Sequence, residues 1–316
     1  MKSNSSLTPL SFQLTLFADY GPLRYLFFSL CLLTYVTIIS ANAVIVLTVC
    51  LEKSLHQPMY IFICCLSCNS LYGTAGFFPR FLRDLLCDTH FISRPMCFLQ
   101  IHVIYSYAAC ELLVLGVMAY DRFVAVCQPL HYHSKMSFTR VAYLVTFTVL
   151  YPALAVAVCV FLTTRLPLCG NKVHRLFCSV VQLSCVDTTV NRIVCTLLSI
   201  STTFAPLVFI LYTYLHILLV LRRSSAEFRG KALQTCLPHF VTFLNYFFSF
   251  LCELMLSRFK SDEVNPIIIV VLSLEFVILP PVSNPLVYGL SLPQIRGVLL
   301  RFFKAHPVEP APPKVY

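Results

Sequence analysis

Charged residues are scarce in this sequence, and tryptophan is missing altogether. Of the 316 residues only 11% are charged whereas 58% are hydrophobic, and the mean hydropathy is +0.81. A soluble domain is about one quarter charged and about one half apolar, so this composition excludes a water-soluble globular protein. It favours an integral membrane protein instead.

Three further features are absent. The formal net charge of +10 is spread along the chain, and no basic cluster exceeds the pair Arg222–Arg223, so we expect no nucleic-acid partner. Residues 1–20 contain no apolar run followed by a cleavage site, so we expect no cleaved signal peptide. No internal repeat is visible, which counts against a transporter built from inverted repeats.

Long stretches with almost no charge indicate membrane-spanning helices. They cover 25–51, 54–79, 95–120, 141–164, 193–221, 232–252 and 264–295, with Glu111 and Glu275 as single interruptions. Each can cross a hydrocarbon core, which takes about 20 helical residues, and lipid-exposed backbone must satisfy its own hydrogen bonds. We therefore expect an all-α integral membrane protein with a seven-transmembrane helix bundle over 24–290.

The remaining segments flank this bundle. We expect residues 1–23 to form an extracellular N-terminus and the proline-rich residues 305–316 to form a disordered cytoplasmic tail. Between them, residues 291–304 mix Leu and Phe with three basic residues, which predicts a short amphipathic helix on the inner membrane face.

Orientation depends on cysteines and one glycosylation sequon. Lys and Arg divide almost evenly between the two sides, so they do not decide the orientation. Asn4-Ser5-Ser6 is a sequon near the N-terminus, and disulfides and glycans belong to the oxidising outside. Five cysteines lie in or beside the loops after the second and fourth spans: Cys87, Cys97, Cys169, Cys178 and Cys185. We therefore expect a plasma-membrane protein with its N-terminus outside and its C-terminus inside, although spacing alone does not fix the disulfide pairing.

Four motifs lie at the ends of predicted spans and indicate a more specific class of membrane protein. They are Pro58-Met59-Tyr60, Met118-Ala-Tyr-Asp121-Arg122, Lys231-Ala-Leu-Gln-Thr235-Cys236-Leu-Pro-His239 and Asn284-Pro285-Leu-Val-Tyr288. Together and in this order they resemble the olfactory receptors of the rhodopsin-like G-protein-coupled receptor class. The resemblance covers nearly the whole chain, from Asn42 onward.

The resemblance implies a switch that contacts a heterotrimeric G protein when the sixth span moves outward. It would comprise Asp121, Arg122, Tyr214, Lys231, Thr235, His239, Asn284, Pro285 and Tyr288. The alternative for Arg122 is a plain interfacial anchor, and for Lys231 a basic collar. The prolines could also serve only helix packing, since proline is common in membrane helices.

The resemblance also places a ligand pocket in the outer half of the bundle. The matching positions are His102, Tyr105, Ala108, Ala109, Ser199, Thr202, Phe247, Phe250, Leu251, Leu254 and Val277. Such a lining, mostly apolar with a few hydroxyls and one imidazole, suits a small, partly apolar molecule. For any single position, simple helix packing is the alternative.

A carboxylate within the third span suggests a functional polar site. In the olfactory family Glu111 usually pairs with an aspartate that forms a sodium site with it, but this chain has Asn69 there. Two alternatives follow: a possible ion site at Asn69 and Glu111, or a Glu111 that is hydrogen-bonded to the Asn69 amide.

The resemblance pairs Cys97 with Cys178 and Cys169 with Cys185, and Asn4 is the candidate glycosylation site. Cys64-Cys65-x-x-Cys68 lies inside a span without a paired histidine, so we expect no metal there, and we expect no cofactor.

The function that the resemblance implies is an odorant receptor. It would be embedded in the lipid bilayer, bind a small, partly apolar odorant in the outer half of the bundle and activate an olfactory-type stimulatory G protein, which raises cAMP. A rhodopsin-like receptor for a non-odorant small ligand is the alternative. An enzyme is disfavoured because no nucleophile and base are assembled in the sequence.

Overall fold

The structure, a computed structural model, describes residues 9–16, 21, 23–178, 184, 186, 188–258 and 264–305. Within these residues, seven helices are long and apolar enough to cross a membrane, which confirms the predicted seven-helix bundle. The spans are α1 (Leu23–Leu51), α2 (Pro58–Leu86), α3 (Arg94–Cys127), α5 (Phe138–Thr164), α6 (Thr189–Ser199) with η4 (Ile200–Phe204) and α7 (Ala205–Arg222), α8 (Ala226–Arg258) and α9 (Pro266–Ser291). Short elements η1 (Lys53–Leu55), η2 (Pro129–His131) and α4 (Tyr132–Lys135) connect them, and α10 (Pro293–Ala305) follows.

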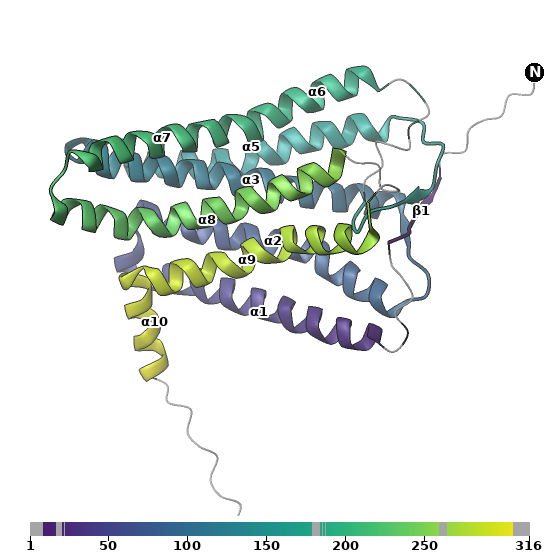
Figure 1. The fold of residues 1–316 in the computed structure, drawn as a ribbon, viewed down its shortest axis with the longest axis horizontal. Coiled ribbons are helices and arrows are strands. Elements are labelled where there is room, and N and C mark those ends of the chain that lie inside the picture. The colour runs from purple at the N-terminus through teal and green to yellow at the C-terminus, as the bar shows by residue number, and fades with distance from the viewer. Residues whose placement is uncertain are drawn as a thin grey trace, which may run out of the picture.

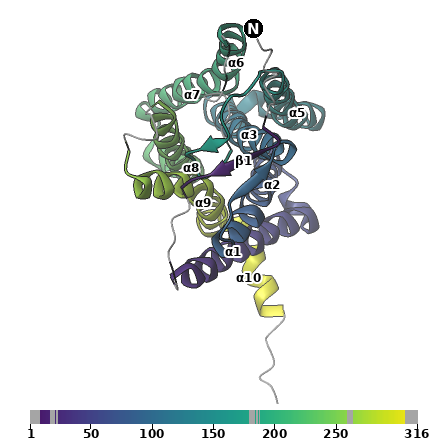
Figure 2. The same ribbon diagram turned by 90° about the vertical axis from the view of Figure 1, so that its right-hand side faces the viewer.

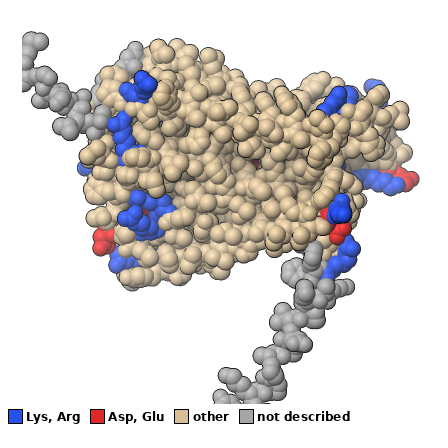
Figure 3. Space-filling view, turned by 180° about the vertical axis from the view of Figure 1, so that it is seen from behind, with Lys and Arg blue, Asp and Glu red and all other residues tan. Residues whose placement is uncertain are grey.

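The helices run side by side around α3, with α10 turned away from the bundle (Figure 1). In the most apolar part of α3, 72% of the residues are buried, compared with 17% in α1 and in α5. On the face seen in Figure 3, Lys and Arg gather at the two ends of the bundle, and the surface between them is almost free of charge. This uncharged belt is the surface that lipid would cover.

Two glycines allow α2 and α3 to approach closely. A Cβ atom on Gly73 would lie 2.4 Å from the ring of Tyr107, and one on Gly76 would lie 2.3 Å from the Val103 side chain. Small residues let helix backbones come together in lipid, where dispersion contacts and hydrogen bonds replace the hydrophobic driving force.

Several helices extend beyond the charge-free windows that predicted them. The second span does not end at 79 but continues to Leu86, because Arg80 and Asp84 form an ion pair of 2.7 Å one turn apart. The sixth begins at Ala226 rather than 232, with a similar pair of 2.6 Å between Glu227 and Lys231. Charges that satisfy each other along one helix face therefore lie inside the helices, not beyond them.

Prolines account for two irregularities. Pro206 lacks the N–H that an α-helix needs, and the preceding residues Ile200–Phe204 form a π-helical turn, as often occurs where the regular ladder is broken. The window 264–295 is two helices, because α9 ends at Ser291 and Pro293 begins α10. Ile295 and Val298 of α10 are buried whereas Arg296 and Arg301 are exposed, so this helix is amphipathic as predicted.

The N-terminal segment, for which we predicted no structure, forms a strand. β1 (Ser11–Leu14) pairs antiparallel with β2 (Phe91–Ser93) and parallel with β3 (Lys172–Val173). This sheet lies across the centre of the ring of helices at one end, which we call the sheet end (Figure 2). Phe12 and Leu14 are buried beneath it, beside the disulfide Cys97–Cys178. The opposite end, where α10 lies, we call the α10 end.

Candidate functional site

At the α10 end, the carboxylate of Asp121 collects hydrogen bonds from two residues. Arg122 donates from Nε at 3.0 Å and also from a terminal guanidinium nitrogen, and the Tyr132 hydroxyl donates at 2.8 Å. Asp121 is fully buried, so it needs such partners. Burial, together with the Asp121 charge, raises the pKa of Tyr132, so its hydroxyl keeps the proton that it donates. The sequence did not indicate Tyr132, because it lies beyond the end of the third span.

Two of the predicted switch residues, Tyr214 of α7 and His239 of α8, are joined directly. The Tyr214 hydroxyl contacts Nδ1 of His239, and Nε2 of the same ring donates to the Leu115 carbonyl of α3 at 3.1 Å. A carbonyl oxygen can only accept, so Nε2 carries a proton and Nδ1 of the neutral ring accepts from Tyr214. His239 is fully buried and therefore links α3, α7 and α8 inside the bundle, not at its surface.

The proline of the Asn284-Pro285 motif frees a backbone acceptor that α1 uses. Pro285 has no N–H for the carbonyl of Pro281, one turn earlier, and that carbonyl accepts from Asn42 Nδ2 at 2.9 Å. Tyr288 is fully buried, with its hydroxyl beside the side chain of Thr242 in α8.

Glu111 connects three helices at the middle of the bundle. Its Oε2 accepts from Asn69 Nδ2 of α2, and its Oε1 accepts from Asn284 Nδ2 of α9, both at 2.7 Å. Asn69 Nδ2 also donates to the Tyr107 carbonyl at 3.1 Å. The structure favours the alternative in which Glu111 is hydrogen-bonded to the Asn69 amide.

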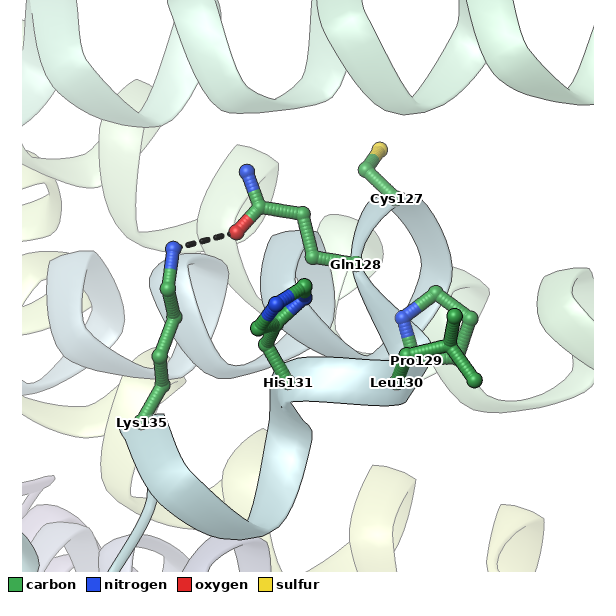
Figure 4. A pocket seen from close by; sticks show the side chains of 6 residues that line it. All are labelled: Cys127, Gln128, Pro129, Leu130, His131 and Lys135. Carbon is green, nitrogen blue, oxygen red and sulfur yellow. Dashed lines mark hydrogen bonds between the residues drawn. The ribbon is translucent and has the colours of Figure 1, made fainter.

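The surface of the α10 end contains two further predicted switch residues and a pocket. Lys231 is exposed and paired with Glu227, and Thr235 donates to the carbonyl of Ala232 at 3.0 Å. A pocket of about 630 Å³ lies beside the end of α3 (Figure 4). Its lining is Cys127, Gln128, Pro129, Leu130, His131 and Lys135. Leu130 is 95% exposed, and no sequence motif indicated it, because it lies outside every one of them.

The predicted ligand-pocket positions are only partly brought together. Tyr105 of α3 lies near Glu253 and Arg175 and keeps 46% of its surface accessible. Ala108, Ala109, Thr202 and Val277 are buried. Intermediate exposure is found for His102, Phe247, Phe250, Leu251 and Leu254. Ser199 is exposed, and its hydroxyl donates to the Cys195 carbonyl of its own helix at 2.7 Å.

Aromatic residues that no sequence motif indicated lie among these positions. The Tyr246 ring stacks on that of Phe250, with centroids 6.2 Å apart, and packs against Phe276 of α9 at 6.4 Å. Its hydroxyl donates to the Ala108 carbonyl of α3 at 2.6 Å. Tyr246 therefore joins α3, α8 and α9 at the floor of the predicted pocket region.

Carboxylates near the sheet end, for which the sequence suggested no role, have specific partners. Arg175 lies 3.7 Å from Glu253 and donates to the Leu256 carbonyl at 2.5 Å. Ser273 donates to Glu253 at 3.2 Å, and Ser249 donates to Glu275 at 2.5 Å. The loop that contains Arg175 is thus attached to α8 by charge as well as to α3 by a disulfide.

The predicted disulfide Cys97–Cys178 is present, and the Cys178 N–H donates to Gln100 Oε1 at 3.1 Å. Cys169 is also disulfide-bonded, but its predicted partner Cys185 lies outside the described residues. The candidate glycosylation site Asn4 lies outside them as well. In the part of the chain that the structure describes, no group of three or more His, Cys, Asp or Glu side chains could hold a metal ion.

These features define a seven-helix receptor with the rhodopsin fold. The structure is similar to the crystal structure of squid rhodopsin, with a TM-score of 0.73 and 17% identity over 93% of this chain and 91% of that chain. The olfactory receptor family model matches residues 30–306, and the chain belongs to this family.

Curated relatives agree with this assignment. The chain is 36% identical to human olfactory receptor 6N1 over 88% of its length and 89% of that protein. It is 34% identical to human olfactory receptor 10R2, over 88% and 84%, and 34% identical to mouse olfactory receptor 4E2, over 89% and 91%. It is therefore a G-protein-coupled odorant receptor, a multi-pass plasma-membrane protein and not an enzyme.

Proposed function

We propose that this olfactory receptor binds a small, partly apolar odorant in the sheet-end half of the bundle and activates an olfactory-type stimulatory G protein, which raises cAMP. The observation that supports this most directly is the hydrogen-bonded chain from Tyr214 through His239 to Leu115. Leu115 precedes Arg122 by about two helical turns on α3. These hydrogen bonds therefore lie between the ligand-pocket region and the residues that would meet the G protein.

The switch would work by separating α8 from α3. A ligand that binds better when α8 has moved outward increases the population of that arrangement. Outward movement breaks the bond between His239 and the Leu115 carbonyl and uncovers Arg122. Asn284, Pro285 and Tyr288 would assist, because a helix interrupted by proline can adopt a second packing at small cost.

The G-protein surface would then comprise Arg122, Lys231, Thr235 and the exposed Leu130. Leu130 offers an apolar contact that projects from the end of α3, and Lys231 and Thr235 lie at the end of the helix that moves. A complementary apolar pocket on the G protein would cover Leu130 on binding.

The ligand would lie beside the accessible Tyr105 and against the aromatic cluster around Tyr246. Hydroxyl and imidazole groups of Tyr105, His102 and Thr202 offer hydrogen bonds within an otherwise apolar lining. This chemistry suits an odorant with an apolar body and one or two polar atoms.

In this proposal the sheet end faces the outside of the cell and the α10 end faces the cytoplasm. The disulfide between Cys97 and Cys178 lies at the sheet end, and disulfides persist in oxidising compartments. A G protein in the cytoplasm would then meet the end that contains Arg122.

The test is cAMP accumulation in cells that express the chain together with the olfactory stimulatory G protein, across a panel of small odorants. We expect at least one odorant to raise cAMP in the native receptor and in Arg140→Ala, whose side chain is exposed at the start of α5. Arg122→Ala should bind the odorant and reach the cell surface but give no response. A full response in Arg122→Ala at equal surface expression would refute the proposed role of Arg122.

A further inference from the structure

A groove opens on the bilayer-facing side of the bundle between α2, α3 and α5. Its volume is about 370 Å³, and it is lined by Cys65, Cys68, Asn69, Tyr72, Ser106, Cys110, Val149 and Ala153. These residues lie near the middle of their spans, and Cys68, Tyr72 and Val149 are exposed there. The groove is therefore open to lipid, away from both aqueous ends. A volume of this size is typical of small-molecule sites.

The groove contains one buried hydrogen-bond acceptor that is not used by the protein. The two neighbours of Asn69 Nδ2, the Tyr107 carbonyl and the Glu111 carboxylate, are both acceptors. The amide nitrogen must face them, so the direction of the side-chain amide is fixed. Oδ1 then points the other way, and among the described residues no donor bonds to it.

Asn69 as a whole is only 7% exposed, but its Oδ1 is not fully buried. The accessible surface of this oxygen therefore lies in the groove that Asn69 lines. An unsatisfied amide oxygen in an apolar environment is unfavourable, and a donor that reaches it from the bilayer would relieve this cost.

The other polar groups of the groove are already paired. The Ser106 hydroxyl donates to the His102 carbonyl at 2.7 Å, so the Tyr72 hydroxyl, 3.0 Å away, is the one that donates to Ser106. The thiols of Cys65, Cys68 and Cys110 are weak hydrogen-bonding groups that behave as small apolar side chains. The groove thus presents one strong acceptor in apolar surroundings.

We propose that this groove is a second binding site, distinct from the odorant pocket, for a small membrane-dissolved alcohol. The apolar body of the ligand would fill the space between α2, α3 and α5, and its hydroxyl would donate to Asn69 Oδ1. Because the same amide holds Glu111 and the Tyr107 carbonyl, occupancy stabilises the joint between α2, α3 and α9. Direct binding tests this site without any signalling readout.

The probe is a medium-chain alcohol that carries a photoreactive diazirine, with its methyl ether as the matched compound without a donor. Each is applied to the purified full chain in phosphatidylcholine nanodiscs, and the labelled peptides are identified by mass spectrometry. We expect the alcohol to label groove peptides about fivefold more than the ether, as one neutral hydrogen bond would give. Asn69→Leu should remove this preference.

Two variants locate the site. Ala153→Phe fills the groove and should reduce the labelling of groove peptides by the alcohol to the level of the ether. Ala205→Phe is the matched control, because Ala205 lines a groove of similar volume, about 360 Å³, between α3, α5 and α7. Val149→Phe replaces Ala153→Phe if that variant does not fold. Equal labelling by alcohol and ether, or unchanged labelling in a folded groove-filled variant, would overturn the proposal.

Discussion

Nδ1 of His239 in α8 receives a hydrogen bond from the Tyr214 hydroxyl of α7, and the two rings lie nearly parallel with their centroids 5.7 Å apart. The opposite nitrogen of the same imidazole donates to the Leu115 carbonyl of α3. One buried side chain thus holds three helices together through two directional bonds. Removing either partner would leave a buried polar group unsatisfied.

His239→Phe should raise ligand-independent signalling. The phenyl ring keeps most of the packing but loses the bond to Leu115 that holds α8 against α3. The loss of a buried hydrogen bond costs about 1 kcal/mol, which corresponds to roughly a fivefold shift of the equilibrium between the two arrangements. Basal cAMP, normalised to surface receptor, measures this shift. The control is Phe248→Leu on an exposed face of the same helix. Basal signalling at or below the native level would contradict the switch.

Tyr132→Phe should also raise basal signalling, through Asp121. The variant removes the hydrogen bond of 2.8 Å to the buried carboxylate that holds Arg122. Hydrogen bonds to charged groups contribute about 1.5–3 kcal/mol, so the effect should be at least as large as that of His239→Phe. Because the pKa of Tyr132 is raised, its hydroxyl stays protonated at physiological pH, and the difference should not depend on pH there. Tyr143→Phe, at a 70% exposed position of α5, serves as the control and should behave like the native receptor.

Gly73→Ala should lower the thermal stability of the purified receptor. The new Cβ atom would meet the Tyr107 ring at 2.4 Å, so α2 and α3 must separate. Overpacking of this kind costs about 1–3 kcal/mol. Gly230→Ala is the matched control: nothing lies within 4 Å of its Cβ position in α8, and alanine favours the helix. The midpoint of thermal unfolding in detergent measures both variants, and an equal midpoint would show that the helices adjust freely.

Cys97→Ser should reduce stability more than any single free-cysteine variant. The disulfide with Cys178 closes a loop with a sequence separation of 81, and the loss of such a bond costs about 2–5 kcal/mol. Cys252→Ser provides the comparison, because Cys252 is free. We expect lower surface expression and a lower unfolding midpoint for Cys97→Ser alone. If both variants behave alike, the sheet end does not depend on this bond.

The sequence predicted the seven spans because lipid imposes one simple requirement, a long stretch of helix without unpaired charge. The predicted helix ends were wrong where charged residues pair with each other, as Arg80 does with Asp84. Composition alone does not distinguish an ion pair along a helix face from a charged loop. The contact between Asn69 and Glu111 could be anticipated because both are rare polar residues in apolar spans. A polar side chain within a membrane span is costly unless it pairs with another polar group.

Other parts of the site had no local signal. The partner of His239 is a backbone carbonyl, at Leu115, and every residue has one, so no pattern marks it. The free oxygen of Asn69 follows from the directions of its neighbours, which only the folded chain provides. β1 was missed because its alternation of polar and apolar residues covers only four positions, and its pairing depends on partners from two distant loops.

The position of β1 has a consequence for the order in which the molecule assembles. The strand is made before both of its partners, because β2 follows about 80 residues later and β3 about 160 residues later. The three-stranded sheet can therefore be completed only after α1, α2, α3 and α5 have been made. Insertion of these four spans therefore proceeds with the sheet end still open.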